Sequence, residues 1–463
     1  MKSNFIRLGI LGILIILCIW QTTLLWLGDA SSHNFLDNTA SDIVTQPKEI
    51  WVNKNGLAYK IDGDNDGSRL DLLVELSNTI KKGKYQLVAT DKTTYEELLS
   101  RQGFVYEYGA QLSIDEILGF TVNRGSSTKE LGKIIELFID ISEGDQYRSY
   151  IYLINKSQKV VAMLSLEGSL VLHNKTIQHY NDENKTTGMK TYQASLLNTN
   201  QASLLNINSS KAFERNIFYP QNNKNMPITY KEIYLRPVIN GNTIEEKVMD
   251  LENYVDSFFK NPLYKQYSIT SKGIIFSDSL NLNIRYSDQG VLEFKRHVTE
   301  ETIKLSAVEK MNKVNRFIEE TEAIPKGLKK GLYLKEVEES EDSGETIYRF
   351  GYRFEGFEVL LTDYAKEQLK TQNFLELAIK SNQVVRGNWL MFEVDVNENE
   401  YIKDAKLTRE GYVAIRDTQK LCKIENLDED PLGYIQCAYI IQNIQVKADF
   451  DWAATYQDKW YYP

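Results

Sequence analysis

The stretch KIDGDNDGSR places aspartates at alternate positions, a spacing that could bind calcium. Asp62, Asp64 and Asp66, with the glycine that follows them, match the first half of an EF-hand loop, in which side-chain oxygens face the ion. Position 12 of such a loop carries a bidentate glutamate, but here it is Leu73, and the nearest acid is Glu75. The same residues also favour a turn before a helix. We therefore keep the three aspartates as weak metal candidates and predict no metal site.

Other residue types that support catalysis are few or wrongly spaced. The sequence has no G-x-S-x-G, Walker A or G-x-G-x-x-G motif. Neither Cys422 nor Cys437 has a neighbouring His or Arg that would activate a thiol, and a disulfide between them is left open. No zinc-binding H-x-x-x-H or H-E-x-x-H pair is formed by the four histidines, of which the second and third are expected in or beside an Asn-rich loop: His33, His173, His179 and His297. We predict that the protein is not an enzyme, with no catalytic residue and no cofactor.

The N-terminus carries an apolar run of the length that crosses a membrane. Residues Leu8–Leu27 contain no charge, and about twenty helical residues span a bilayer core of roughly 30 Å. Lys2 and Arg7 precede the run, which predicts a cytoplasmic N-terminus and an extracellular remainder. A cleaved signal peptide would have a shorter apolar core, and the residues around Cys18 are too bulky for lipoprotein processing. We expect an uncleaved, single-pass anchor in the cell membrane.

One face of this predicted helix could contact another membrane helix. Gly9, Gly12 and Thr23 fall on one side at about 100° per residue, and small or hydroxylated residues let helices approach closely. Glycine is also common in membrane helices without such a role. Both interpretations stay open.

The rest of the chain is predicted to be a large, acidic ectodomain. Its formal net charge of −10, from 64 acidic and 54 basic residues, argues against nucleic-acid binding. A tandem duplication, QASLLNTN then QASLLNIN, lies in an Asn-rich segment that reads as a loop. The expected units are the cytoplasmic tip and anchor, a tether, an N-terminal α+β domain, the Asn-rich loop or linker, a middle α+β domain, and a C-terminal helix-plus-meander domain: 1–27, 28–47, 48–172, 173–225, 226–300 and 301–463.

Local patterns predict an α+β fold, in which helices pack on one face of curled antiparallel sheets. An apolar stripe from Ile244 to Phe258 predicts one helix, and the capping box of Ser306 with Glu309 begins another that ends near Pro325. Alternating residues predict hairpins, one of them turning at Glu355 and the glycine after it. The acidic run EVEESEDSGE is expected to be solvated charge at a hairpin tip.

Several stretches together resemble the YycH family of bitopic regulators from low-GC Gram-positive bacteria. They are CIWQTTLLWLGD, TYEELLSRQGFVYEYGAQLSIDEILGF and VDSFFKNPLYKQYSITSKGIIFSDSLNLNIRYSDQGVLEFKRH. These stretches are diffuse, and their order spans the anchor and the ectodomain to about residue 300. The later part is similar to the helix-plus-meander units that YycH shares with YycI and to PepSY-like modules. The duplicated segment and the DGDNDG turn depart from the family pattern.

The resemblance implies a non-enzymatic role in signalling. YycH-family proteins act with YycI on the sensor histidine kinase WalK, also called YycG, through membrane helices and outer domains. We therefore expect a kinase of this type and a YycI-like companion as partners. The alternative is a surface-anchored, PepSY-like binding or inhibitory module that acts on a wall hydrolase or an ion.

Overall fold

The computed structural model describes most of the chain from residue 45 onward. The described residues are 45–54, 57–61, 68–82, 85–89, 97–98, 101–122, 133–141, 148–155, 160–167, 169–179, 191–195, 219–220, 230–259, 261–278, 281–297, 304–340, 343–402, 411–425, 434–443, 447–457 and 459–462. The predicted membrane anchor lies before them. No helix within these ranges is both long enough and apolar enough to cross a membrane.

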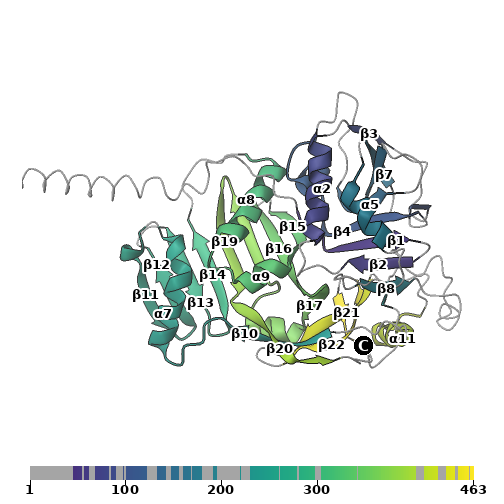
Figure 1. Ribbon diagram of the computed structural model, residues 1–463. Helices are drawn as coiled ribbons and strands as arrows, with labels where there is room; N and C mark the ends of the chain where they lie inside the picture. Colours follow the sequence, from purple (N-terminus) through teal and green to yellow (C-terminus); the bar gives the residue numbers. More distant parts are fainter. Residues whose placement is uncertain are drawn as a thin grey trace, which may run out of the picture.

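An antiparallel sheet forms the N-terminal part of the structure (Figure 1). Its strands are β1 (Glu49–Lys54), β2 (Leu57–Ile61), β3 (Tyr85–Ala89), β4 (Gly103–Leu112), β5 (Ile134–Asp140), β6 (Arg148–Ile154), β7 (Val160–Glu167), β8 (Thr191–Ser195) and β9 (Tyr219–Pro220). They lie in the order β3-β7-β6-β5-β4-β1-β2-β8-β9. Every residue of β5 is buried, since one face joins the main core and the other joins a cluster around Trp51. Burial on both faces explains its nearly continuous apolar sequence.

Three helices accompany this sheet: α2 (Ser68–Lys82), α4 (Ile114–Leu118) and α5 (Val171–His179). The helix predicted after the DGDNDG turn is confirmed as α2, which buries Leu73, Ser77 and Ile80 in the expected spacing. The predicted hairpin of β6 and β7 is also confirmed, because the two strands pair antiparallel from Arg148–Glu167 to Ile154–Val160. The residue periodicity of the local sequence was sufficient to predict both elements.

The expected Asn-rich loop at 173–225 differs from the structure in part. Its first residues belong to α5, and β8 lies across the start of the duplication. β8 pairs with β2, from Ala58–Ala194 to Ile61–Thr191. A free strand edge on β2 therefore orders a segment whose composition favours loops, and this edge could not be read from the local sequence.

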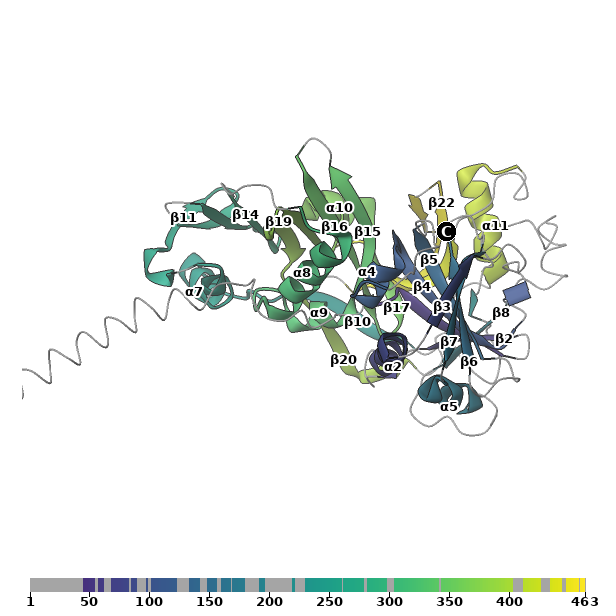
Figure 2. The ribbon, with the colours of Figure 1, turned by 90° about the horizontal axis from the view of Figure 1, so that it is seen from above.

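A larger sheet occupies the rest of the structure (Figures 1 and 2). Its strands are β11 (Gln266–Thr270), β12 (Gly273–Ser277), β13 (Leu282–Tyr286), β14 (Val291–Arg296), β15 (Leu332–Ser340), β16 (Glu345–Phe354), β17 (Phe357–Leu361), β18 (Leu375–Lys380), β19 (Gln383–Leu390), β21 (Tyr434–Ile441), β22 (Asp449–Tyr456) and β23 (Lys459–Tyr461). The order is β11-β12-β13-β14-β19-β18-β16-β17-β21-β22-β23, with β15 paired to β16. All these pairings are antiparallel except that of β17 with β21, which is parallel.

This sheet is continuous across the domain boundary expected at residue 300. β14 pairs with β19 over Val291–Leu390 to Lys295–Arg386, so the middle and C-terminal segments share one hydrogen-bonded sheet. A separate two-stranded sheet joins β10 (Tyr230–Pro237) to β20 (Phe392–Ile402). Long-range strand pairing sets these connections, and the helix-then-strand pattern of the sequence did not reveal them.

Helices and short 3-10 turns accompany the larger sheet: α7 (Ile244–Val255), η1 (Asp256–Phe258), η2 (Pro262–Tyr264), α8 (Ala307–Glu320), α9 (Lys326–Gly331), α10 (Asp363–Leu369) and α11 (Gly411–Cys422). The Ser306–Glu309 capping box is present at the start of α8, as predicted. α8 ends at Glu320, before Pro325, which instead precedes α9. α7 buries Val248, Leu251 and Val255, and the predicted helix then tightens into η1.

The predicted hairpin turn at Glu355 is confirmed between β16 and β17. Glu355 and Gly356 both have positive φ, 47° and 83°, as the favoured two-residue hairpin turns require. The described residues therefore form antiparallel sheets with packed helices, in agreement with the predicted α+β class.

Candidate functional site

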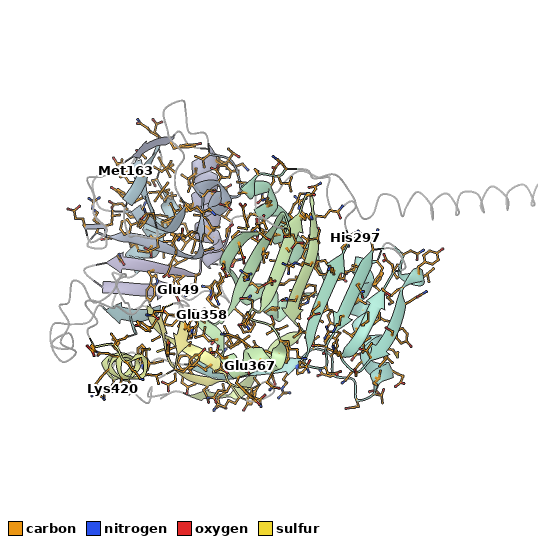
Figure 3. All side chains as sticks on the ribbon, turned by 180° about the vertical axis from the view of Figure 1, so that it is seen from behind. Glu49, Met163, His297, Glu358, Glu367 and Lys420 are labelled. Atoms are coloured by element: carbon orange, nitrogen blue, oxygen red, sulfur yellow. The ribbon has the colours of Figure 1, made fainter. Side chains whose placement is uncertain are left out.

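Charged side chains are buried where the N-terminal sheet meets the larger sheet. β4 runs beside β15 so closely that a Cβ on Gly109 would lie 2.4 Å from the carbonyl oxygen of Leu334. Only glycine permits that approach. Nearby, Asn312 Nδ2 on α8 donates to the carbonyl oxygen of Gly119 at 2.9 Å. We call this contact region the junction, and Figure 3 labels Glu358 close to it.

The carboxylate of Glu358, on β17, is the centre of the junction. It is 4% exposed and accepts hydrogen bonds from the Tyr333 hydroxyl on β15 and, at 2.5 Å, from Gln436 Nε2 on β21. Lys48 Nζ lies 3.1 Å from the same carboxylate. Lys48 precedes β1, so one acidic group ties the N-terminal part of the chain to three strands of the larger sheet.

Both members of this ion pair stay charged at neutral pH. Burial acts to raise the pKa of Glu358, but the charge of Lys48 and the hydrogen bonds from Tyr333 and Gln436 outweigh burial and lower it. Burial acts to lower the pKa of Lys48, but Glu358 and two further glutamates outweigh burial and raise it. Each charge is thus stabilised by the other, and removing one takes away the nearest opposite charge of a buried group.

Arg353 lies across from Glu358 and brings a second cation to the junction. The two residues are Cα partners on β16 and β17, and the Arg353 side chain is 2% exposed. Its Nε and Nη1 atoms have no hydrogen-bond partner among the described residues. The guanidinium carbon lies 5.4 Å from the ring centroid of Tyr333, close enough for a cation–π contact. Arg353 is therefore a buried cation at the junction, with a cation–π contact to Tyr333 and two nitrogens that lack hydrogen bonds to the described residues.

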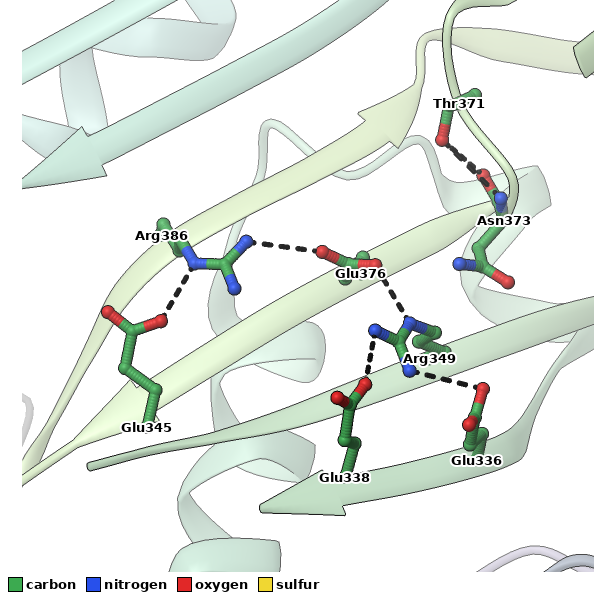
Figure 4. Close-up of polar contacts among 8 residues, drawn as sticks. All are labelled: Glu336, Glu338, Glu345, Arg349, Thr371, Asn373, Glu376 and Arg386. Carbon is green, nitrogen blue, oxygen red and sulfur yellow. Dashed lines mark hydrogen bonds and ion pairs between the residues drawn. The ribbon is translucent and has the colours of Figure 1, made fainter. Parts of the chain in front are cut away.

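The same sheet face continues outward as a partly exposed ladder of ion pairs (Figure 4). Arg349 contacts Glu336 at 3.1 Å, Glu338 at 2.6 Å and Glu376 at 3.1 Å. Arg386 contacts Glu376 at 3.2 Å and Glu345 at 2.9 Å. Cross-strand pairing explains the arrangement, because Arg349 is the Cα partner of both Glu336 and Glu376.

The ladder corrects the expectation for the acidic run EVEESEDSGE. Three of its acids, Glu336, Glu338 and Glu345, form ion pairs with arginines of the sheet, and Glu345 is only 19% exposed. Sequence reasoning missed the arginines of the ladder and the junction. The signal was the alternation in YRFGYRFEG, where aromatic residues on one face leave Arg349 and Arg353 on the other.

His173 was wrongly expected in or beside a loop and is instead fully buried on α5. Its Nδ1 lies 2.7 Å from Glu75 Oε2 and its Nε2 lies 2.6 Å from the Tyr106 hydroxyl. Glu75 also accepts from the backbone N–H groups of Leu172 and His173, at 2.6 and 3.1 Å, and so caps α5. The carboxylate requires Nδ1 to carry the proton, which leaves Nε2 to accept from Tyr106. This chain links α2, α5 and β4.

The other candidate positions are located as follows. The membrane-helix candidates Gly9, Gly12 and Thr23 lie outside the described residues. So do the weak metal candidates, which are Asp62, Asp64 and Asp66. In the part of the chain that the structure describes, no group of three or more His, Cys, Asp or Glu residues could hold a metal. Cys422 and Cys437 are free thiols, so the disulfide left open by the sequence is not formed.

Comparison with known proteins adds a likeness of fold. No protein-family model and no curated protein matches the sequence. The solved structure of YycH from Bacillus subtilis aligns with 91% of this chain and 96% of its own, with a TM-score of 0.54 and 10% sequence identity. The fold is YycH-like. At this identity the likeness concerns the fold alone.

A second solved structure, an uncharacterized protein from Eubacterium rectale, is less similar. It aligns with 61% of this chain and 89% of its own, at 10% identity and a TM-score of 0.34. That score supports no argument about this chain. The YycH-like architecture of the described residues therefore rests on the Bacillus subtilis structure.

Proposed function

We propose that this chain is a membrane-anchored, extracytoplasmic regulatory protein that modulates a cell-wall-linked sensor histidine kinase by protein–protein contacts. The observation that carries the proposal is the YycH-like fold over 91% of the chain. The proposed partners are a kinase of the WalK/YycG type and a YycI-like companion. The role requires no enzymatic activity.

The predicted topology supports this proposal. An uncharged run at Leu8–Leu27 behind Lys2 and Arg7 would hold the protein in the cell membrane with its bulk outside. Contacts in the membrane or outside it are the proposed route of its influence on the kinase.

The junction suits a protein that works by presenting surfaces. Lys48 and Glu358 fix the N-terminal sheet against the larger sheet through a desolvated ion pair. A fixed arrangement keeps two outer surfaces at a constant separation, and partners bound to both would then be coupled. The partly exposed ladder around Arg349 offers one such charged surface.

A reporter of the kinase's transcriptional output tests the proposal in cells. Deletion of the chain should change the output, and the full-length chain should restore it. Gly9→Leu with Gly12→Leu should stay inserted, because Leu favours the bilayer, yet block the close approach of a partner helix. Gly9→Ala with Gly12→Ala is the matched control, since small residues are retained.

The outcome distinguishes regulation through the membrane helix from regulation through the outer domains. Loss of control in the Leu pair, with control kept in the Ala pair, supports contact through the membrane helix. Equal activity of the Leu pair and of an ectodomain on an unrelated anchor would assign regulation to the outer domains. An output unaffected by deletion of the chain would refute the proposed function.

A further inference from the structure

β11 forms an open edge at the far end of the larger sheet from the N-terminal sheet (Figures 1 and 2). Within the described residues it pairs only with β12, and all five of its residues are exposed. Two apolar side chains of the strand, Tyr267 and Ile269, are 54% and 51% exposed. Leu263 and Tyr264, just before the strand, are 89% and 73% exposed. The edge therefore offers unpaired backbone together with apolar side chains.

The register of the β11–β12 hairpin shows which backbone groups are free to bond. Thr270 and Gly273 close a two-residue turn as a hydrogen-bonded pair, and the pairs alternate from there along the ladder. Ser268 is thus hydrogen-bonded to β12. The N–H and C=O groups of Tyr267 and Ile269 point away from β12, towards the open edge.

Features that usually protect an edge strand are missing here. β11 contains no proline and no charged residue, and its pairing with β12 has no bulge. Lys265 could have served as a protecting charge. Its side chain is only 7% exposed, however, and it pairs with Glu252 and Asp256 on the α7 side. The strand is open to a further β-strand.

We propose that β11 pairs antiparallel with β11 of a second copy of this chain. A two-fold axis at Ser268 would place Tyr267 opposite Ile269 of the second copy, and Ile269 opposite its Tyr267. Both pairs fall on residues whose backbone groups face the edge, so both are hydrogen-bonded. The opposed side chains form aromatic and β-branched cross-strand pairs, which are favourable.

Two properties of the strand favour a second copy as the occupant. Its register is complementary to itself, as two-fold interfaces require. The strand also contains no charged residue. Two copies paired in this way therefore place no like charges opposite one another, which would destabilise the ladder of a chain with a net charge of −10. The sheet would continue from one copy into the other. This inference is independent of the proposed kinase partner.

Disulfide trapping in the full-length, membrane-inserted chain tests the register. Ser268 faces Ser268 across the axis as a non-hydrogen-bonded pair, with Cα atoms about 4.5 Å apart, within the range of a disulfide. Ser268→Cys should give a disulfide-linked dimer on mild oxidation, mapped by mass spectrometry to residue 268. The native chain, with its own three cysteines, gives the background.

Matched variants separate this register from random collision. Gln266→Cys and Thr270→Cys should not link to themselves, but a mixture of the two should form the 266–270 bond. Ile269→Pro removes an N–H that faces the edge and spares those bonded to β12. Added to Ser268→Cys, it should abolish the dimer. Ile269→Val, which keeps the N–H, should retain it.

The proposal is overturned if Ser268→Cys and the mixed pair both give no dimer above the native background. It is also overturned if residue 268 links to a different protein and never to itself, because another partner would then occupy the edge. A dimer that survives Ile269→Pro would equally contradict strand pairing.

Discussion

Arg353 and Glu358 lie directly opposite each other on β16 and β17, yet the carboxylate of Glu358 is bonded to Tyr333, Gln436 and Lys48. Arg353 keeps two buried nitrogens without a hydrogen-bond partner among the described residues. The two residues of this cross-strand pair therefore contribute unequally to the stability of the junction. Glu358 holds the junction together, whereas Arg353 mainly adds a desolvated charge.

Glu358→Gln should strongly destabilise the protein. The change keeps the shape but removes the carboxylate that lies 3.1 Å from the buried Lys48 ammonium, and removing one member of a buried pair costs about 3–5 kcal/mol. Chemical denaturation monitored by circular dichroism measures this loss. A Lys48→Met/Glu358→Leu double variant should recover part of it, because both members of the buried ion pair are then replaced together by apolar side chains. A loss below about 1 kcal/mol in the single variant would contradict a central role for this carboxylate.

Arg353→Met should be tolerated far better than Glu358→Gln. Methionine fills similar space, and it removes a buried cation that lacks partners for two of its nitrogens. We expect a change in unfolding free energy within about 1 kcal/mol of zero, or a small gain. A loss as large as that of Glu358→Gln would show that Arg353 is bound more tightly than its contacts indicate.

Stability should fall in acid through His173. Burial lowers the pKa of His173, and its hydrogen bond to Glu75 only partly opposes that shift. As the pH falls below about 6.5, the unfolded chain takes up a proton that the folded chain resists, so the free energy of unfolding decreases. Hydrogen bonds hold the pKa of Glu75 below 4.5 despite its burial, so its contribution is present above about pH 4.5 and is lost in stronger acid.

His173→Gln should flatten the dependence of stability on pH between about 6.5 and 5. It should also lower stability at pH 7.5, because the contacts to Glu75 and Tyr106 are weakened. Melting temperatures measured across this range test both effects. His297→Gln, at an exposed histidine after β14, is the matched control for the substitution. An unchanged slope in His173→Gln would exclude His173 as the titrating group.

Two glycine-to-alanine substitutions should change the free energy of unfolding in opposite directions. A Cβ at Gly351 would lie 2.4 Å from the ring of Tyr333, so Gly351→Ala must displace the tyrosine that donates to Glu358. Overpacking of this kind typically costs about 1–3 kcal/mol. Gly327 lies inside α9 with no atom nearer than 4.0 Å to its added Cβ. Gly327→Ala should therefore stabilise by about 0.5–1 kcal/mol. Denaturation midpoints that shift in the same direction in both variants would contradict this prediction.

The sequence predicted those parts of the structure that depend on neighbouring residues. The Ser306–Glu309 box lies within one helical turn, and the apolar stripe of α7 lies within one continuous helical segment. The turn at Glu355 was likewise set by two residues. Such elements need no knowledge of the rest of the fold.

The junction could not be predicted in the same way. Lys48 and Glu358 are far apart in the chain, and they meet only because β17 pairs with both β16 and β21 while β4 packs along β15. His173 was misplaced because the sequence after it is rich in Asn, Lys and Thr, although Glu75 and Tyr106 enclose it in the structure. A strand register is needed before either set of partners can be found.

Reconstitution of the kinase with this chain tests the proposed function most directly. The full-length chain and the host's WalK/YycG-type kinase would be inserted together into liposomes, and kinase autophosphorylation would be measured as the amount of chain is raised. Coupling of about 1 kcal/mol or more predicts a saturable change of roughly fivefold or greater in kinase activity. The Gly9→Leu/Gly12→Leu chain should give a smaller change if the membrane helix carries the contact. A rate that stays constant up to saturating amounts of correctly inserted chain, with or without a YycI-like companion, would contradict the account.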